Sequence, residues 1–143
     1  MPRYFDVRTT VLLVVGYGIL AEEEDRPIGY DLKRAISSRS EGADNRTAVV
    51  VTDMWMLNQE MADMFPAVAV GGPAVNAFTA HIYEDLPIAF MRDQQIFIQM
   101  NQDRGKRAAL WGMDQRGTRE AAELFVKDGL LDRFLELVWL RSA

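Results

Sequence analysis

The chain has 143 residues and no cysteine, and this length suits one domain that buries a core without disulfides or a structural metal. Sixteen Lys and Arg against 21 Asp and Glu give a net charge of −5, which repels phosphate backbones and argues against a nucleic-acid partner. We therefore expect residues 1–143 to form a single domain without thiolate chemistry, compatible with a reducing cytoplasm.

The first apolar run, Val11 to Ala21, has the length of a signal-peptide core and follows Arg3 and Arg8. It is too short to span a bilayer. No Ala-x-Ala cleavage site follows it, and the acidic letters "EEED" come at once. We interpret it as a buried strand, and we expect a cytoplasmic protein with no membrane partner.

Short runs rich in Val and Ile alternate with helix-like segments, which is typical of a layered α/β domain. About five strands are predicted: Thr10–Val15, Ala48–Thr52, Ala67–Val70, Gln95–Met100 and Arg107–Trp111. Ile88–Met91 is a candidate for an extra edge strand. The first three are almost continuously apolar, as expected for strands covered on both faces. The sequence thus predicts one three-layer, doubly wound, Rossmann-like α/β domain with a mostly parallel sheet.

Two helices are predicted in the first half of the chain. Asp25 and Pro27 begin a helix that continues to Ile36, and the acidic run that ends at Asp25 is typical of a solvated loop. After Asp53, apolar residues at helical spacing predict a core-facing helix that ends at Pro66. Its apolar face comprises Met54, Leu57, Met61, Met64 and Phe65.

Two more helices are predicted around later turns. Pro73 occupies a first helical position, and an apolar stripe carries that helix to Pro87. Thr118 is the expected N-cap of the next helix, and Gly129 is well placed to end it.

The last segment, "LLDRFLELVWL", is more apolar than one packing face requires. One face carries Leu130, Leu131, Phe134, Leu135 and Val138, and other faces carry Leu137, Trp139 and Leu140. Two interpretations stand: this helix is the interface of a homo-oligomer, a dimer in the simplest case, or it is wedged between neighbouring elements.

Small and polar residues follow the predicted strands, and the carboxyl ends of parallel strands meet at one edge where ligands bind. Asn101, after the fourth strand, is expected at this edge too. Gly71 and Gly72 allow a sharp turn with exposed N–H groups, and a helix start near Pro73 adds partial positive charge. We expect a small anionic or polar ligand held at Gly71, Gly72 and Gly112, with Asp53, Asn76, Asp114 and Thr118 completing the site.

The same residue types also serve as turn glycines and helix caps in any α/β protein, so a purely structural interpretation stands beside the ligand site. Asp53 and Asp114 could bind Mg²⁺ or form a carboxylate pair, but helix capping explains each as well, and no metal site is predicted. His81, the only histidine, is expected to be a surface or packing residue.

Neither common nucleotide motif is present: "GYGILA" lacks a third glycine, and no stretch matches Gly-x4-Gly-Lys-Ser/Thr. A dinucleotide or ATP cofactor would therefore rest on fold analogy alone, and the sequence leaves the cofactor unknown. It favours a binding or interaction module, with an enzyme acting on a nucleotide- or phosphate-containing substrate as the alternative.

The pairing of "VAVGGPAVNAF" with "AALWGMDQRGTREAAELF" resembles a unit of archaeal surface-layer proteins and of small uncharacterised bacterial proteins. In that unit a strand enters Gly-Gly-Pro-x-x-Asn and a helix, and a later strand ends in glycine before a Thr-x-x-Ala helix start. The likeness covers roughly residues 48–126 and implies a doubly wound α/β domain. The likeness makes a cell-envelope structural component a further alternative. It also carries over six signature positions without a catalytic role: Gly71, Gly72, Pro73, Asn76, Gly112 and Thr118.

Overall fold

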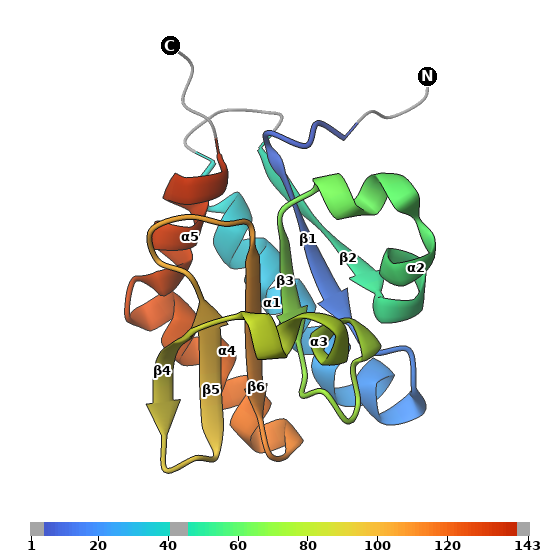
Figure 1. The fold of residues 1–143 in the computed structure, drawn as a ribbon, viewed down its shortest axis with the longest axis vertical. Coiled ribbons are helices and arrows are strands. Elements are labelled where there is room, and N and C mark those ends of the chain that lie inside the picture. The colour runs from blue at the N-terminus through green and yellow to red at the C-terminus, as the bar shows by residue number, and fades with distance from the viewer. Residues whose placement is uncertain (1–4, 41–45, 140–143) are drawn as a thin grey trace.

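The computed structural model describes residues 5–40 and 46–139, which form one sheet of six strands with helices on both faces (Figure 1). This confirms the predicted three-layer α/β class. The strands are β1 (Thr10–Val15), β2 (Thr47–Thr52), β3 (Ala67–Val70), β4 (Ile88–Arg92), β5 (Ile96–Met100) and β6 (Arg107–Gly112). The count exceeds the expected five because the candidate edge strand is formed, as β4.

The strand order is β2-β1-β3-β6-β5-β4, and the first four strands in this order are parallel to one another. β5 is antiparallel to both β4 and β6. Asp93 and Gln94 have positive φ angles of 53° and 56°, the conformation of a two-residue hairpin turn, and so reverse the chain between β4 and β5. Asn101 therefore lies at the opposite end of the sheet from Gly112, and its expected place at the shared ligand edge is wrong.

The helical segments are a π-helical turn η1 (Ala21–Asp25), α1 (Arg26–Ser37), α2 (Asp53–Asn58), 3-10 turns η2 (Glu60–Met64) and η3 (Tyr83–Asp85), α3 (Ala77–Ile82), α4 (Gln115–Lys127) and α5 (Leu130–Val138). One core joins α1, α4 and α5 to one face of the sheet. A smaller core joins α2, η2 and α3 to the other face. Every residue of β1 and β3 is buried, so the centre of the sheet is covered on both sides.

The predicted core-facing helix after Asp53 is broken, and its expected apolar face is wrong except at Phe65, which is partly buried against the smaller core. Gln59 has extended angles (φ −112°, ψ 109°), so the helical periodicity restarts there. Met56 and Ala62 are the buried residues of this segment. The expected core residues Met54, Leu57, Met61 and Met64 are instead 41–68% exposed.

The C-terminal helix buries its apolar face within its own chain. Leu131, Phe134, Leu135 and Val138 belong to the larger core, and Trp139 directly after the helix is 6% exposed. Leu130 and Leu137 are partly buried against the same core, while Leu140 lies outside the described residues. This placement matches the wedged-helix interpretation, and self-association through α5 stays a prediction. In the part of the chain that the structure describes, no helix combines the length and apolar character needed to cross a membrane.

Candidate functional site

The carboxyl ends of β1, β3 and β6 lie side by side and point the same way, downward in Figure 1. α1, which follows β1, packs on one face of the sheet, and α3, which follows β3, packs on the other. The chain thus leaves these neighbouring strands in opposite directions. In open α/β sheets, this is the point at which ligand crevices form.

Asp25 lies at this point, against the turn after β3. The side chain is buried, with 2% exposure, and a Cβ atom placed on Gly71 would lie 2.9 Å from Asp25 Oδ2. Gly71 has a φ of +112°, so glycine is required there both for the backbone conformation and for the contact. The carboxyl group therefore packs directly on the β3 exit.

The carboxyl group of Asp25 has an unsatisfied oxygen atom. Its Oδ1 is buried and has no hydrogen-bond partner among the residues that the structure describes. Burial, and to a lesser degree the charge of Glu24, together raise the pKa of Asp25 to about 6. A buried carboxyl group with a raised pKa in a crevice is typical of a functional site.

The sequence prediction missed Asp25, because the acidic run was expected to be a solvated loop. Glu22, Glu23 and Glu24 are indeed exposed, but Asp25 points inward with Ala21. The two buried positions are four residues apart and continue the buried stripe of α1, which comprises Ile28, Leu32 and Ile36. Helical periodicity extended backward through the acidic run would therefore have placed Asp25 on the buried face.

A cavity of about 500 Å³ opens beside Asp25. Its lining comes from the end of η1, the β3 exit, the β6 exit, the start of α4 and η3: Asp25, Gly72, Pro73, Ala74, Val75, Tyr83, Trp111, Gly112, Met113, Asp114, Gln115 and Thr118. Two lining residues are acidic, and none is Lys, Arg or His. The cavity thus combines negative charge with a largely apolar and aromatic wall.

Two of the three glycine N–H groups expected to hold an anion are already engaged. Gly71 N–H donates to Leu110 O at 3.0 Å, and Gly112 N–H donates to Thr118 Oγ1 at 3.1 Å. The third, Gly72 N–H, has no acceptor among the described residues. The expected cradle of N–H groups is therefore used for the protein's own turns.

Asn76 is fully occupied by backbone groups. Its amide donates to Val14 O and Val70 O at 2.9 Å each, and its Oδ1 accepts from Phe78 N and Thr79 N at 3.0 Å. Asn76 thereby caps α3, so this helix begins at Ala77 and the predicted start at Pro73 is wrong. The side chain joins β1, β3 and α3 and has no capacity left for a ligand.

Asp53 also serves the fold and does not line the cavity. Its Oδ1 accepts from Met54 N at 2.7 Å, and its Oδ2 accepts from Ala77 N at 2.8 Å. The carboxylate thus connects the first turns of α2 and α3. This position agrees with the helix-capping interpretation.

Asp114, and not Thr118, is the N-cap of α4. Asp114 Oδ1 accepts from Gly117 N at 2.7 Å. Thr118 lies one turn inside the helix and its hydroxyl bridges two backbone groups, accepting from Gly112 N and donating to Asp114 O at 3.2 Å. Both side chains line the cavity, but their hydrogen bonds first shape the turn after β6.

Trp111 forms a rigid wall of the cavity. Its ring stacks on Phe97 with centroids 4.3 Å apart, and Tyr83 meets it edge-on at 6.2 Å. Its indole N–H donates to Gln99 Oε1 at 2.8 Å, and Gln99 is itself anchored to Tyr83 O and Leu86 O. This network fixes the aromatic surface that a ligand would meet.

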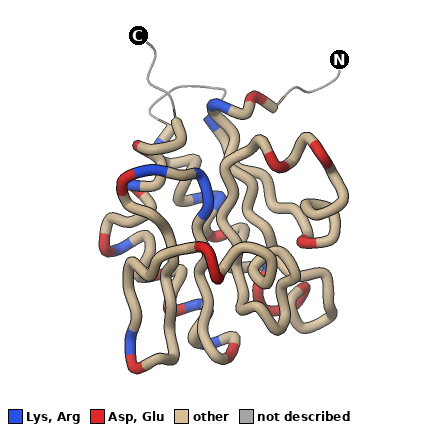
Figure 2. The backbone as a smooth tube through the Cα atoms, in the orientation of Figure 1, with Lys and Arg blue, Asp and Glu red and all other residues tan. Residues whose placement is uncertain are grey.

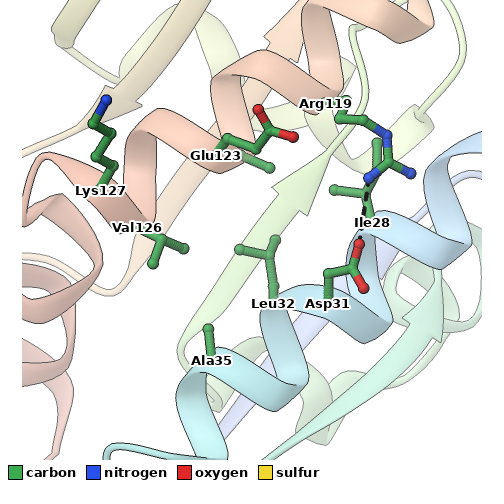
Figure 3. Close-up of a pocket in the computed structure, with 9 residues that line it drawn as sticks. Ile28, Asp31, Leu32, Ala35, Arg119, Glu123, Val126 and Lys127 are labelled. Carbon is green, nitrogen blue, oxygen red and sulfur yellow. Dashed lines mark hydrogen bonds and ion pairs between the residues drawn. The ribbon is translucent and has the colours of Figure 1, made fainter.

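A second cavity, of about 430 Å³, lies between α1 and α4 and contains none of the predicted site residues (Figure 3). Its floor is apolar, with Ile28, Leu32, Ala35 and Val126 among the lining residues. At its rim Arg119 pairs with Asp31 at 3.3 Å. It resembles an ordinary crease between two packed helices.

No basic residue is among those that line the first cavity, although Arg26 and Arg116 directly follow the lining residues Asp25 and Gln115. The β5–β6 loop carries Arg104 and Lys106 at the amino end of β6, opposite the carboxyl edge (Figure 2). His81 is exposed on α3, as predicted. Among residues 5–40 and 46–139, no group of three His, Asp or Glu side chains is placed to hold a metal ion.

The fold and this cavity define a doubly wound α/β domain with an acidic, aromatic-walled crevice at the carboxyl edge of its sheet. Comparison with known proteins adds no relative, because no family model and no curated protein matches the chain. The positions that carry the surface-layer resemblance include Gly71, Asn76, Gly112 and Thr118, all of which shape βα turns here.

Proposed function

We propose that this chain is a small-molecule binding module, working in the cytoplasm, whose site is the cavity at the carboxyl ends of β3 and β6. The supporting observation is Asp25 Oδ1, a buried atom without a partner among the described residues, in a side chain that lines the cavity. Buried polar atoms are nearly always hydrogen-bonded. Thr10 Oγ1 and Trp139 Nε1 are also buried without a partner in the described chain, but of the three residues Asp25 alone lines the cavity, where a ligand would supply the missing partner.

A second candidate is an enzyme that acts on a small substrate at the same place. The observation that favours it is the pKa of Asp25, which burial raises to about 6, close to the range in which a carboxyl group exchanges protons at neutral pH. A phosphate-containing substrate fits less well, because the lining residues include two carboxylates and no cation. Binding without turnover of the bound compound would separate the two candidates.

The binding proposal can be tested with the three tryptophans of the chain as internal reporters. Trp111 lines the cavity, Trp55 is 43% exposed on α2, and Trp139 is buried against α5. In an NMR screen of small polar and aromatic compounds on ¹⁵N-labelled protein, a ligand of this cavity should shift the Trp111 indole signal and leave those of Trp55 and Trp139 in place. A ligand present at about 100 times its Kd should add about 2.7 kcal/mol to the free energy of unfolding.

Ala74→Trp, which places a large side chain in the cavity wall, should abolish this response. The matched control is Ala80→Trp, since Ala80 is exposed on α3 and does not line the cavity. If binding persists in Ala74→Trp, or if compounds shift Trp55 or Trp139 instead, the cavity is not the site.

A further inference from the structure

Building on the proposed binding function, we infer that this cavity selects an organic cation, with an ammonium group beside Asp25 and an apolar or aromatic body along Trp111 and Tyr83. This class of ligand differs from the anionic one that the strand-exit glycines suggested. Four features of the cavity carry the inference.

The first feature is the sign of the charge. Asp25 and Asp114 line the cavity, which has no cationic lining residue to balance them. The nearest arginine in sequence, Arg26, is directed elsewhere: it lies 3.6 Å from Glu22 and over the Tyr30 ring. A ligand ammonium would supply the missing counter-charge.

The second feature is the unsatisfied oxygen. Asp25 is 2% exposed, and its Oδ1 has no hydrogen-bond partner within the described chain. A buried carboxylate is costly unless it is paired and hydrogen-bonded. An ammonium group offers up to three donors and a positive charge to the same atom.

The third feature is the absence of a working anion site among these residues. The N–H groups of Gly71 and Gly112 donate to Leu110 O and Thr118 Oγ1. The N-terminus of α4, which would otherwise attract an anion, is capped by the carboxylate of Asp114. An anionic ligand would therefore meet two carboxylates with little compensation.

The fourth feature is the aromatic wall. The Trp111 ring is held in place by Phe97 and Gln99, with the Tyr83 ring edge-on to it. A cation next to such rings gains cation–π attraction, and an apolar body gains contact area. A metal ion fits less well, because the described residues contain no cluster of three carboxylate or imidazole ligands.

The test compares three probes that share one body: 2-phenylethylamine, 2-phenylethanol and phenylacetate. Titrations followed at the Trp111 indole signal and by calorimetry, at about pH 7.5 where Asp25 is ionised, should rank the amine first. A charge-assisted hydrogen bond to a buried carboxylate should make the amine bind about tenfold or more tighter than the alcohol. Phenylacetate and inorganic phosphate should bind most weakly.

Asp25→Asn should lower the affinity for the amine by about tenfold or more and leave that for the alcohol almost unchanged. Glu23→Gln, which removes an exposed charge two residues away, is the matched control and should retain the preference. Asp114→Asn removes the other carboxylate while keeping an oxygen for the α4 cap, so it gives a second variant in case Asp25→Asn folds poorly. It should weaken the amine less strongly than Asp25→Asn does.

The outcomes separate this inference from the proposed function. If the alcohol or phenylacetate binds at Trp111 as tightly as the amine, or if both aspartate variants keep the amine affinity, the cavity binds ligands but does not select cations. If Mg²⁺ alone shifts Trp111 and displaces the amine, the site is for a metal and the inference is overturned. If no compound affects Trp111, both proposals fail.

Discussion

The ionised form of Asp25, which the proposed cation site requires, lowers the stability of the fold. An unperturbed aspartate has a pKa of 3.8, and burial followed by the charge of Glu24 raises the pKa of Asp25 to about 6. The ionised carboxylate is therefore less stable in the folded chain than in the unfolded one. Residues that act in binding or catalysis often cost stability in this way.

This cost predicts a specific pH dependence. Between about pH 4 and pH 6 the folded state holds a proton that the unfolded state has released, so the contribution of Asp25 to the free energy of unfolding decreases as the pH rises. The difference between the pKa of 3.8 in the unfolded chain and about 6 in the folded chain corresponds to a free energy of about 3 kcal/mol. Asp25→Asn should therefore stabilise the protein by up to about 3 kcal/mol at pH 7 and by much less at pH 4.

Urea unfolding of both proteins across this pH range measures the difference. Glu23→Gln, an exposed neighbour, should follow the pH profile of the unchanged protein. Parallel profiles for Asp25→Asn and the unchanged protein would mean that Asp25 titrates as an ordinary exposed aspartate.

Four of the seven residues expected at a ligand site line the cavity, namely Gly72, Gly112, Asp114 and Thr118, whereas Asp53, Gly71 and Asn76 do not. Polar side chains at strand exits can serve a ligand or a backbone cap, and residue type alone does not separate these uses. Asn76 uses both donors and its acceptor oxygen on backbone groups, and Thr118 bridges Gly112 and Asp114. Asp25 was missed because acidic runs are usually solvated.

At the scale of elements, strands were easier to predict than helix starts. β1 and β3 match their predicted bounds because buried strands read as short, continuous apolar runs. The starts of α3 and α4 depend on which residue's side chain accepts from the N–H groups of the first turn. Asn76 and Asp114 do so, and this choice depends on the geometry of each turn.

The cap of α4 offers a quantitative test at this scale. Asp114→Ala removes the acceptor for Gly117 N and should lower the free energy of unfolding by about 1 kcal/mol, while Asp114→Asn should lower it by less. Thr118→Val should cost about 1–3 kcal/mol, because Gly112 N–H loses its acceptor in a buried turn. Denaturant unfolding of the three variants measures these differences.

The sequence prediction that Thr118 is the N-cap of α4 leads to different expected stabilities for these variants. If Thr118 were the cap, Thr118→Asn would preserve stability and Asp114→Ala would change it little. Such a pattern would contradict the cap geometry of α4.

At the scale of the whole molecule, the direction of β5 could not be predicted from local sequence patterns. The strand that ends at Met100 is apolar enough for a parallel strand, and only its pairing with β4 and β6 sets its direction. Pairing partners lie far apart in sequence, so periodicity does not report them. The shared edge therefore contains the exits of β1, β3 and β6 but not that of β5.

The C-terminal helix provides the prediction for the assembled molecule. Its apolar face packs on the core of its own chain, where Phe134 is 1% exposed and meets Phe125 with ring centroids 6.4 Å apart. Phe134→Ala should therefore lower the free energy of unfolding by about 3–5 kcal/mol through loss of core packing. The unfolding midpoint of the unchanged protein should not depend on protein concentration, because no second chain is needed to bury this face. A midpoint that rises with concentration, together with a doubled mass by light scattering that Leu137→Arg returns to that of one chain, would instead support the self-association predicted from the sequence.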